Sequence, residues 1–101
     1  MIRRAVWTPR AESELDDILF HIAVRTGRPE TGIKNYFEIR SLVDEYARED
    51  APRHKHPVSP EDWFYCRHKR WLIFYRLYDE GIEVMRLIDG SRDLPQQFEN
   101  G

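Results

Sequence analysis

Hydrophobic positions in the first half of the chain recur at helical spacing. Between Pro9 and Gly27 they fall three or four residues apart, which predicts one helix with a single buried face. The expected buried positions of this first helix are Ala11, Leu15, Ile18, Leu19 and Ile22. Because Glu14, Asp17 and His21 lie off this face, we expect them to be solvated.

A second helical pattern covers residues 30–49. Its expected apolar stripe consists of Ile33, Phe37, Val43 and Ala47, widened by Tyr36, Ile39, Leu42 and Tyr46. Thr8 followed by Pro9 is typical of a helix start, while Gly27 and the Arg28-Pro29 pair provide a stop and a turn. Two helices of this length with a short connection predict an antiparallel helical hairpin.

The second half of the chain has the composition and alternation of strands. Residues 63–68, 71–78 and 82–88 predict three consecutive strands, and 71–78 is apolar on both faces, as expected of a central strand. Asp79-Glu80-Gly81 provides the turn between the last two. Strict alternation would place Ile82, Val84 and Arg86 on one face of the final strand.

The two ends and the middle loop complete the pattern. Residues 2–7 predict a first strand, which must join the sheet non-sequentially because it precedes the helices. Residues 50–62 contain three prolines among their histidines and predict a loop. Asp93 is expected to cap a short turn over 94–98. The order β-α-α-β-β-β predicts one α+β domain over residues 1–101, with the helical hairpin packed on an antiparallel sheet.

Composition excludes several classes of protein. The chain is 41% hydrophobic and 34% charged, a globular balance. A single cysteine, Cys66, excludes an internal disulfide and a cysteine-based metal site, and we expect it to be half-buried. No apolar run approaches the length of a membrane span, so we expect a cytoplasmic protein with no membrane contact. The net charge is −2, although residues 53–76 carry six Lys or Arg against two acidic residues.

Several short segments of the sequence resemble ParE-type toxins of the ParE/RelE superfamily of toxin–antitoxin, or plasmid stabilisation, proteins. The closing segment reads FYR at 74–76, DEGIEV at 79–84 and RLIDGSRDL at 86–94, and the opening reads WTP at 7–9 and LDDI at 15–18. The resemblance covers nearly the whole chain, although residues 50–65 depart from the family pattern. It implies a toxin that binds DNA gyrase and is held inactive by a cognate antitoxin. The alternatives are a RelE-like endoribonuclease that cuts mRNA on the ribosome, and a non-toxic family member.

The residues needed for RNA cleavage are incomplete in this sequence. Cleavage requires a group that takes the 2′-hydroxyl proton, cations for the phosphorane and a group that protonates the leaving oxygen. By the resemblance, Phe98 lies where RelE-like enzymes carry a carboxy-terminal tyrosine, and Leu72 lies where RelE carries an arginine. Arg92 matches a catalytic arginine that ParE-type sequences also keep. We therefore predict no catalytic residue, no metal and no cofactor.

Three histidines leave an alternative open. His54, His56 and His68 could converge beside the cations at 67–70 and supply acid–base groups near neutral pH. The simpler interpretation of His54 and His56 is a solvated, proline-rich loop. A metal site there would need a third ligand, to which the sequence does not point.

Five arginines are the candidate residues for binding the target or the antitoxin. They are Arg67, Arg70, Arg76, Arg86 and Arg92. The turn at 79–81 predicts position 76 opposite 84 and position 86 opposite 74, which would place two of these arginines on one face. The structural alternative is that Arg76 and Arg86 pair with Glu83, Asp89 or Asp93 and that Arg92 belongs to a helix-capping motif. Trp63, Trp71 and Phe74 are expected in the core or on a sheet face.

Overall fold

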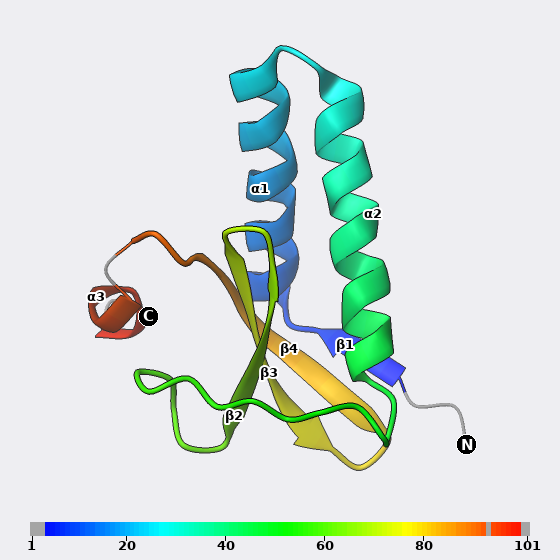
Figure 1. Ribbon diagram of the computed structural model, residues 1–101, viewed down its shortest axis with the longest axis vertical. Helices are drawn as coiled ribbons and strands as arrows, with labels where there is room; N and C mark the ends of the chain where they lie inside the picture. Colours follow the sequence, from blue (N-terminus) through cyan, green and yellow to red (C-terminus); the bar gives the residue numbers. More distant parts are fainter. Residues whose placement is uncertain (1–3, 93, 100–101) are drawn as a thin grey trace.

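The computed structural model describes residues 4–92 and 94–99 and has the element order β-α-α-β-β-β-α (Figure 1). The elements are β1 (Arg4–Trp7), α1 (Pro9–Thr26), α2 (Pro29–Tyr46), β2 (Trp63–His68), β3 (Trp71–Tyr78), β4 (Gly81–Asp89) and α3 (Leu94–Glu99). The predicted α+β fold with its helical hairpin is confirmed. The predicted cap at Asp93 and the start of the first strand at Ile2 lie outside the described residues.

The sheet contains one parallel pair of strands. Its order is β1-β4-β3-β2, in which β2, β3 and β4 form the expected antiparallel meander. The first strand joins non-sequentially, as predicted, but it runs parallel to β4 from Arg4 opposite Gly81 to Trp7 opposite Val84. The sheet is therefore mixed, and β4 continues beyond the end of its short neighbour.

The two faces of the sheet are covered by different parts of the chain (Figure 1). The helical hairpin covers one face, where Leu15 and Ile39 pack with strand residues such as Tyr75. On the other face, Leu72, Phe74 and Ile88 are covered by Trp63, Tyr65, Leu94 and Phe98. Because β3 is buried on both sides, its sequence is apolar at successive positions, as expected of a central strand.

Local signals set the helix ends, with one correction. Thr8 Oγ1 accepts a hydrogen bond from the Ala11 N–H at 3.1 Å, and Gly27 ends α1 in the left-handed region at φ 68°. The second helix ends at Tyr46 and not at residue 49 as predicted. The guanidinium of Arg53 donates to the backbone carbonyl of Tyr46 at 2.6 Å, so a side chain satisfies a carbonyl that the helix leaves free.

The buried stripe of α2 also differs from the prediction. Ile33 and Phe37 are exposed, at 47% and 61%, whereas Ile39 and Val43 are buried. A Cβ at Gly32 would lie 2.6 Å from the Leu19 carbonyl oxygen, so the two helix backbones nearly touch there. This close contact turns Ile33 and Phe37 away from α1, and the tip of the hairpin extends beyond the sheet (Figure 1). No described helix has the length and apolar character needed to span a membrane.

Candidate functional site: the arginine corner

Asp89, at the end of β4, holds two of the candidate arginines. Its Oδ2 lies 2.7 Å from Arg70 Nη2 and 4.0 Å from Arg92 Nε, and its Oδ1 accepts from the backbone and the hydroxyl of Ser91. Burial alone would raise the pKa of Asp89. The hydrogen bonds from Ser91 and the charge of Arg70 outweigh burial and lower the pKa below 3.8. Asp89 is therefore an ionised anchor that orients the exposed Arg92 and the partly exposed Arg70.

The third candidate of this region, Arg86, is buried, which corrects two expectations. Its side chain is 7% exposed and its Nη2 lies 2.9 Å from Oε2 of Glu14, which was expected to be solvated. The Nη1 of Arg86 donates to the carbonyl of Gln97 at 3.3 Å. Arg86 thus pairs with neither Glu83 nor Asp89, while the third predicted carboxylate, Asp93, lies outside the described residues. As a buried residue, Arg86 is not part of the exposed basic surface.

Arg86 is buried against Glu14 because one edge of β4 is free. Beyond β1 no described strand lies beside this edge, so the N-cap residue Thr8 and α1 supply the hydrogen-bond partners. Thr8 Oγ1 donates to the Val84 carbonyl at 3.0 Å, and Glu14 Oε1 accepts from the Leu87 N–H at 2.9 Å. The same Glu14 carboxylate then neutralises Arg86, so it satisfies a backbone donor and a buried charge at once.

We call Arg70, Arg86, Arg92, Asp89 and Glu14 the arginine corner. A cavity of about 250 Å³ is lined by four of these residues, all except Arg86, and its apolar lining includes Ile18, Trp71 and Leu87. Six of its lining residues carry charge or can gain it: Glu14, Asp17, His21, Arg70, Asp89 and Arg92. A cavity lined by apolar side chains and by charges of both signs fits a side chain of a protein partner better than it fits a reacting phosphate.

The other two candidate arginines lie elsewhere. Arg76 Nε lies 2.6 Å from Glu83 Oε1, so the predicted pairing with Glu83 is confirmed. A bulge between Phe74 and Tyr75 shifts the register, which places Arg76 opposite Glu83 and not opposite Val84, while Arg86 is opposite Phe74 as expected. The bulge also breaks the predicted alternation, since Leu87 joins Val84 in the core under the helices.

Arg67 is exposed on β2, at the edge of the sheet. It forms no ion pair with any described residue. Of the five candidates, the structure therefore gathers Arg70, Arg86 and Arg92 and leaves Arg67 and Arg76 apart.

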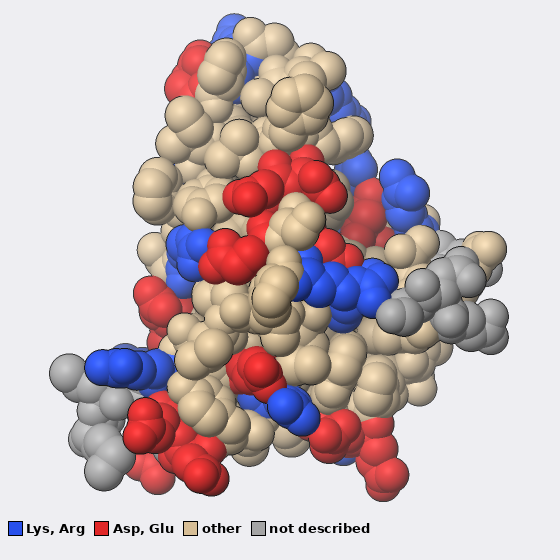
Figure 2. Space-filling view, turned by 180° about the vertical axis from the view of Figure 1, so that it is seen from behind, with Lys and Arg blue, Asp and Glu red and all other residues tan. Residues whose placement is uncertain are grey.

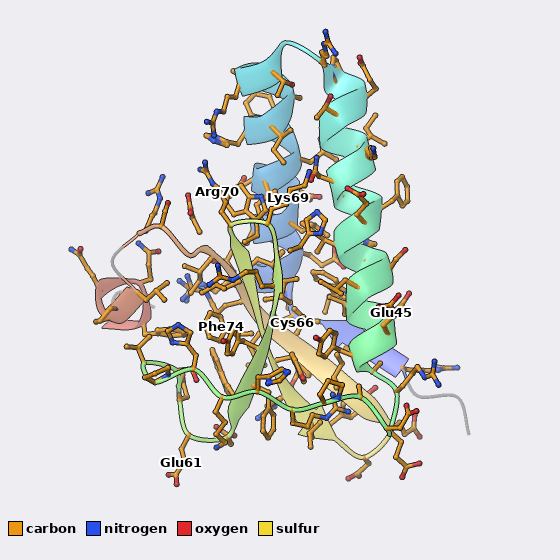
Figure 3. All side chains as sticks on the ribbon, in the orientation of Figure 1. Glu45, Glu61, Cys66, Lys69, Arg70 and Phe74 are labelled. Atoms are coloured by element: carbon orange, nitrogen blue, oxygen red, sulfur yellow. The ribbon has the colours of Figure 1, made fainter. Side chains whose placement is uncertain are left out.

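An aromatic cluster fills the sheet face opposite the helical hairpin. The ring of Phe98 lies 5.0 Å from that of Phe74 and 5.9 Å from that of Trp63. His56 packs edge-on against Phe74 at 5.9 Å, so it is half-buried and not a solvated loop residue. Phe74, labelled in Figure 3, is fully buried, and this face offers no open surface at its centre.

The three histidines do not converge. His54 pairs with Tyr65 at the edge of β2, whereas His68 Nε2 faces α2, 3.2 Å from Asn35 Oδ1. In the part of the chain that the structure describes, no group of three His, Cys, Asp or Glu residues could hold a metal ion. Cys66 is more buried than expected, at 3% exposure, and burial raises the pKa of its thiol to about 12, so it is not a nucleophile.

Sequence reasoning missed an apolar surface at the tip of the helical hairpin. It consists of Phe20 and Val24 on α1 and Ile33 and Phe37 on α2, all between 47% and 69% exposed, and we call it the apolar tip. Each pair is spaced four residues apart, which puts its members on one helix face. In Figure 2 this upper end of the molecule is largely tan, with carboxylates gathered below it. The signal was present, because Phe20 and Val24 lie off the buried stripe of α1.

Comparisons with known proteins agree with this architecture. The family model described as "ParE toxin of type II toxin-antitoxin system, parDE" matches residues 5–94. A solved structure, "Chromosomal ParDE TA system from P. aeruginosa", is similar with a TM-score of 0.74 and 19% sequence identity. The similarity covers 87% of this chain and 96% of that chain, and at this identity it shows a shared fold. No curated protein matches the sequence.

Proposed function

This chain belongs to the ParE toxin family of type II toxin–antitoxin systems, and we propose that it is a toxin that acts on DNA gyrase by binding it, without cleaving a substrate. We further propose that a cognate antitoxin neutralises it. The single observation that carries the first proposal is the aromatic cluster around Phe98.

The aromatic cluster argues against RNA cleavage. Phe98 has no group that exchanges protons, and its ring is packed between Phe74 and Trp63. Leu72, at the position where RelE carries an arginine, is 1% exposed in the same cluster. Arg92 stays at the surface near the carboxylate of Asp89, which offsets its charge. Acid, base and phosphorane-stabilising groups therefore do not meet on this face.

The arginine corner is the surface we assign to the target. Arg70 and Arg92 are 39% and 68% exposed, and both line a cavity beside Asp89, which pairs with Arg70 at 2.7 Å and lies 4.0 Å from Arg92. Buried cavities flanked by oriented arginines are typical anchor points of protein interfaces. Arg86 contributes indirectly, since it joins β4 to α1 behind the cavity. Arg67 and Arg76, which lie apart from the arginine corner, are candidates for peripheral contacts with the target or the antitoxin.

The apolar tip is the surface we assign to the antitoxin. Each helix of the hairpin exposes two large apolar side chains on one face, and exposed apolar side chains of this kind are common at interaction sites. Their spacing, four residues apart on each helix, suits an amphipathic segment laid across the hairpin. This assignment supplies the partner that the toxin–antitoxin family requires.

The test is inhibition of purified gyrase. Plasmid supercoiling should be lost when the protein is added in excess, and an Arg70→Gln/Arg92→Gln variant should inhibit much less. Arg48→Gln, which removes an exposed arginine paired with Asp50, is the matched control and should inhibit normally. Unaffected supercoiling by the native protein would reject the gyrase proposal. Cleavage of mRNA on ribosomes would then establish the enzyme alternative.

A further inference from the structure

A second cavity, on the other side of Trp71, is lined by cations without carboxylates. Its volume is about 350 Å³, and it lies between the second half of α1 and the turn that joins β2 to β3. Its charged lining is Arg25 from α1 and Lys69 and Arg70 from the turn, with His21 beside them. Figure 3 shows Lys69 and Arg70 together at that turn, next to the helices. No Asp or Glu lines the cavity.

Two of these positive charges, Arg25 and Lys69, lack compensation within the described residues. Neither Arg25 nor Lys69 forms an ion pair or a side-chain hydrogen bond there. Arg70 uses Nη2 for Asp89, while its Nε is buried with no hydrogen-bond partner. The charge of Arg70 is already offset in part by Asp89, whereas Arg25 and Lys69 have no acidic partner, and an anion in the cavity would interact favourably with both.

The turn holds one of these cations in a strained conformation. His68 pairs with Trp71, so Lys69 and Arg70 form a two-residue turn. Lys69 has φ 56°, a region that non-glycine residues rarely adopt and that such turns usually give to glycine. A lysine at this position lowers the local stability of the turn and places a positive charge at the cavity.

The neutral groups of the cavity indicate the class of anion. Asn35 already bonds the Thr31 carbonyl at 2.9 Å and His68, and Thr26 bonds the Ile22 carbonyl at 2.7 Å. The cavity therefore offers charge and few free neutral donors or acceptors, whereas an acidic peptide would also need partners for its backbone. Charge alone is sufficient for a polynucleotide backbone, which presents one phosphate after another.

The aromatic lining indicates how specific such binding would be. Trp71 is 8% exposed, and the Arg70 guanidinium covers its ring at 4.8 Å. No open tryptophan face is left for a nucleobase to stack on. We propose that this cavity binds the phosphate backbone of a polynucleotide through Arg25, Lys69 and Arg70, without recognising bases. The inference does not depend on gyrase being the target.

The test is binding of the purified protein alone to fluorescently labelled duplex DNA at several salt concentrations. Three phosphate contacts predict a slope of about −2.7 for log Kobs against log salt, or a loss of ~40-fold in affinity between about 50 and 200 mM salt. Arg25→Gln/Lys69→Gln should reduce the slope to about −0.9. Arg48→Gln removes one exposed arginine elsewhere and should leave the slope unchanged. The same binding measurement with single-stranded DNA and with RNA of the same sequence shows which class of polynucleotide the cavity binds.

Two further variants separate charge from folding. Lys69→Arg keeps the charge and should bind normally. Lys69→Gly relieves the strained φ and stays folded, but it removes one phosphate contact, so the slope of log Kobs against log salt should become less negative by about 0.9. A flat salt dependence, or equal losses in the Arg48 and Arg25/Lys69 variants, would overturn the proposal. Binding of polyglutamate in place of all three polynucleotides would overturn it in favour of an acidic protein.

Discussion

Glu14 and Arg86 are 72 positions apart in the chain and form a nearly buried ion pair, with the Arg86 side chain 7% exposed and that of Glu14 20% exposed. The pair joins the first half of α1 to the part of β4 that extends past β1 and is paired with β3 alone. A carboxylate that satisfies both a guanidinium and a backbone N–H is difficult to replace.

Replacing Glu14 with Ala should therefore destabilise the fold. The change leaves the charge of Arg86 buried without its partner and the Leu87 N–H without its acceptor. We expect the free energy of unfolding to fall by about 3 kcal/mol, measured by urea denaturation. Asp17→Ala, on the exposed side of the same helix, should change it by less than about 0.5 kcal/mol. Equal effects of the two changes would contradict the buried pair.

Replacing Arg86 with Ala should also destabilise the protein, whereas an exposed arginine would tolerate the change. The variant leaves Glu14 without its cation and opens space behind the arginine corner, so we expect a loss of about 2 to 3 kcal/mol. Reduced gyrase inhibition by this variant would then reflect unfolding. A melting transition identical to that of the native protein would show that Arg86 is not part of the core.

Phe98 should act as a packing residue. Truncation to Ala removes its contacts with Phe74 and Trp63 and should lower the free energy of unfolding by about 2 kcal/mol, less than for a fully buried ring. Phe20→Ala, at 69% exposure, is the control and should have little effect on stability. Phe98→Tyr, which restores the hydroxyl of RelE-like enzymes, should not produce mRNA cleavage on ribosomes. Cleavage by that variant would show that the face is competent for catalysis.

Gly32 should be intolerant of any side chain. A methyl group there would lie 2.6 Å from the Leu19 carbonyl oxygen, so the helices would have to separate. We expect Gly32→Ala to lower the melting temperature clearly and to weaken antitoxin binding at the apolar tip. Gly27→Ala, where the added carbon meets no atom within 4 Å, should cost only the strain of φ 68°, about 1 kcal/mol. A larger loss at Gly27 than at Gly32 would refute the close helix contact.

His68 should make stability depend on pH. Burial lowers its pKa below 6.5, with Lys69 adding to the effect and Glu38 opposing it. The folded state then binds fewer protons than the unfolded state, so stability should decline as the pH falls below about 6.5. His68→Gln removes this titration. As the pH falls, the unfolding free energy of the variant should therefore rise relative to that of the native protein. A difference independent of pH would contradict the burial of His68.

The sequence predicts features that depend on neighbouring residues. The cap at Thr8 and the stop at Gly27 follow from local backbone chemistry, and the apolar strand 71–78 follows from burial on both faces. The predictions were wrong for features that depend on residues distant in the chain. The burial of Arg86 depends on Glu14 in another element, and no pattern within β4 contains that information.

The second helix illustrates the same limit. It carries apolar residues on more than one face, and Gly32 in contact with α1 decides that Ile39 is buried and Phe37 exposed. For the candidate site, two of the five arginines, Arg70 and Arg92, line one cavity beside Asp89, and Arg86 is paired with Glu14, another residue of its lining. Neither feature is visible in residue spacing.

The pairing of β1 with β4 has a consequence for the order of events during synthesis. Arg4 lies beside Gly81, so the first strand has no strand to pair with, and Glu14 has no ion-pair partner, until the last strand exists. The helical hairpin needs only local contacts. The roughly forty residues from Tyr46 to Arg86 take about 2 to 8 seconds to translate. For that interval the nascent chain presents its helices without a sheet beneath them. A helix-binding partner that is already in the cell can therefore capture this toxin before its fold is complete.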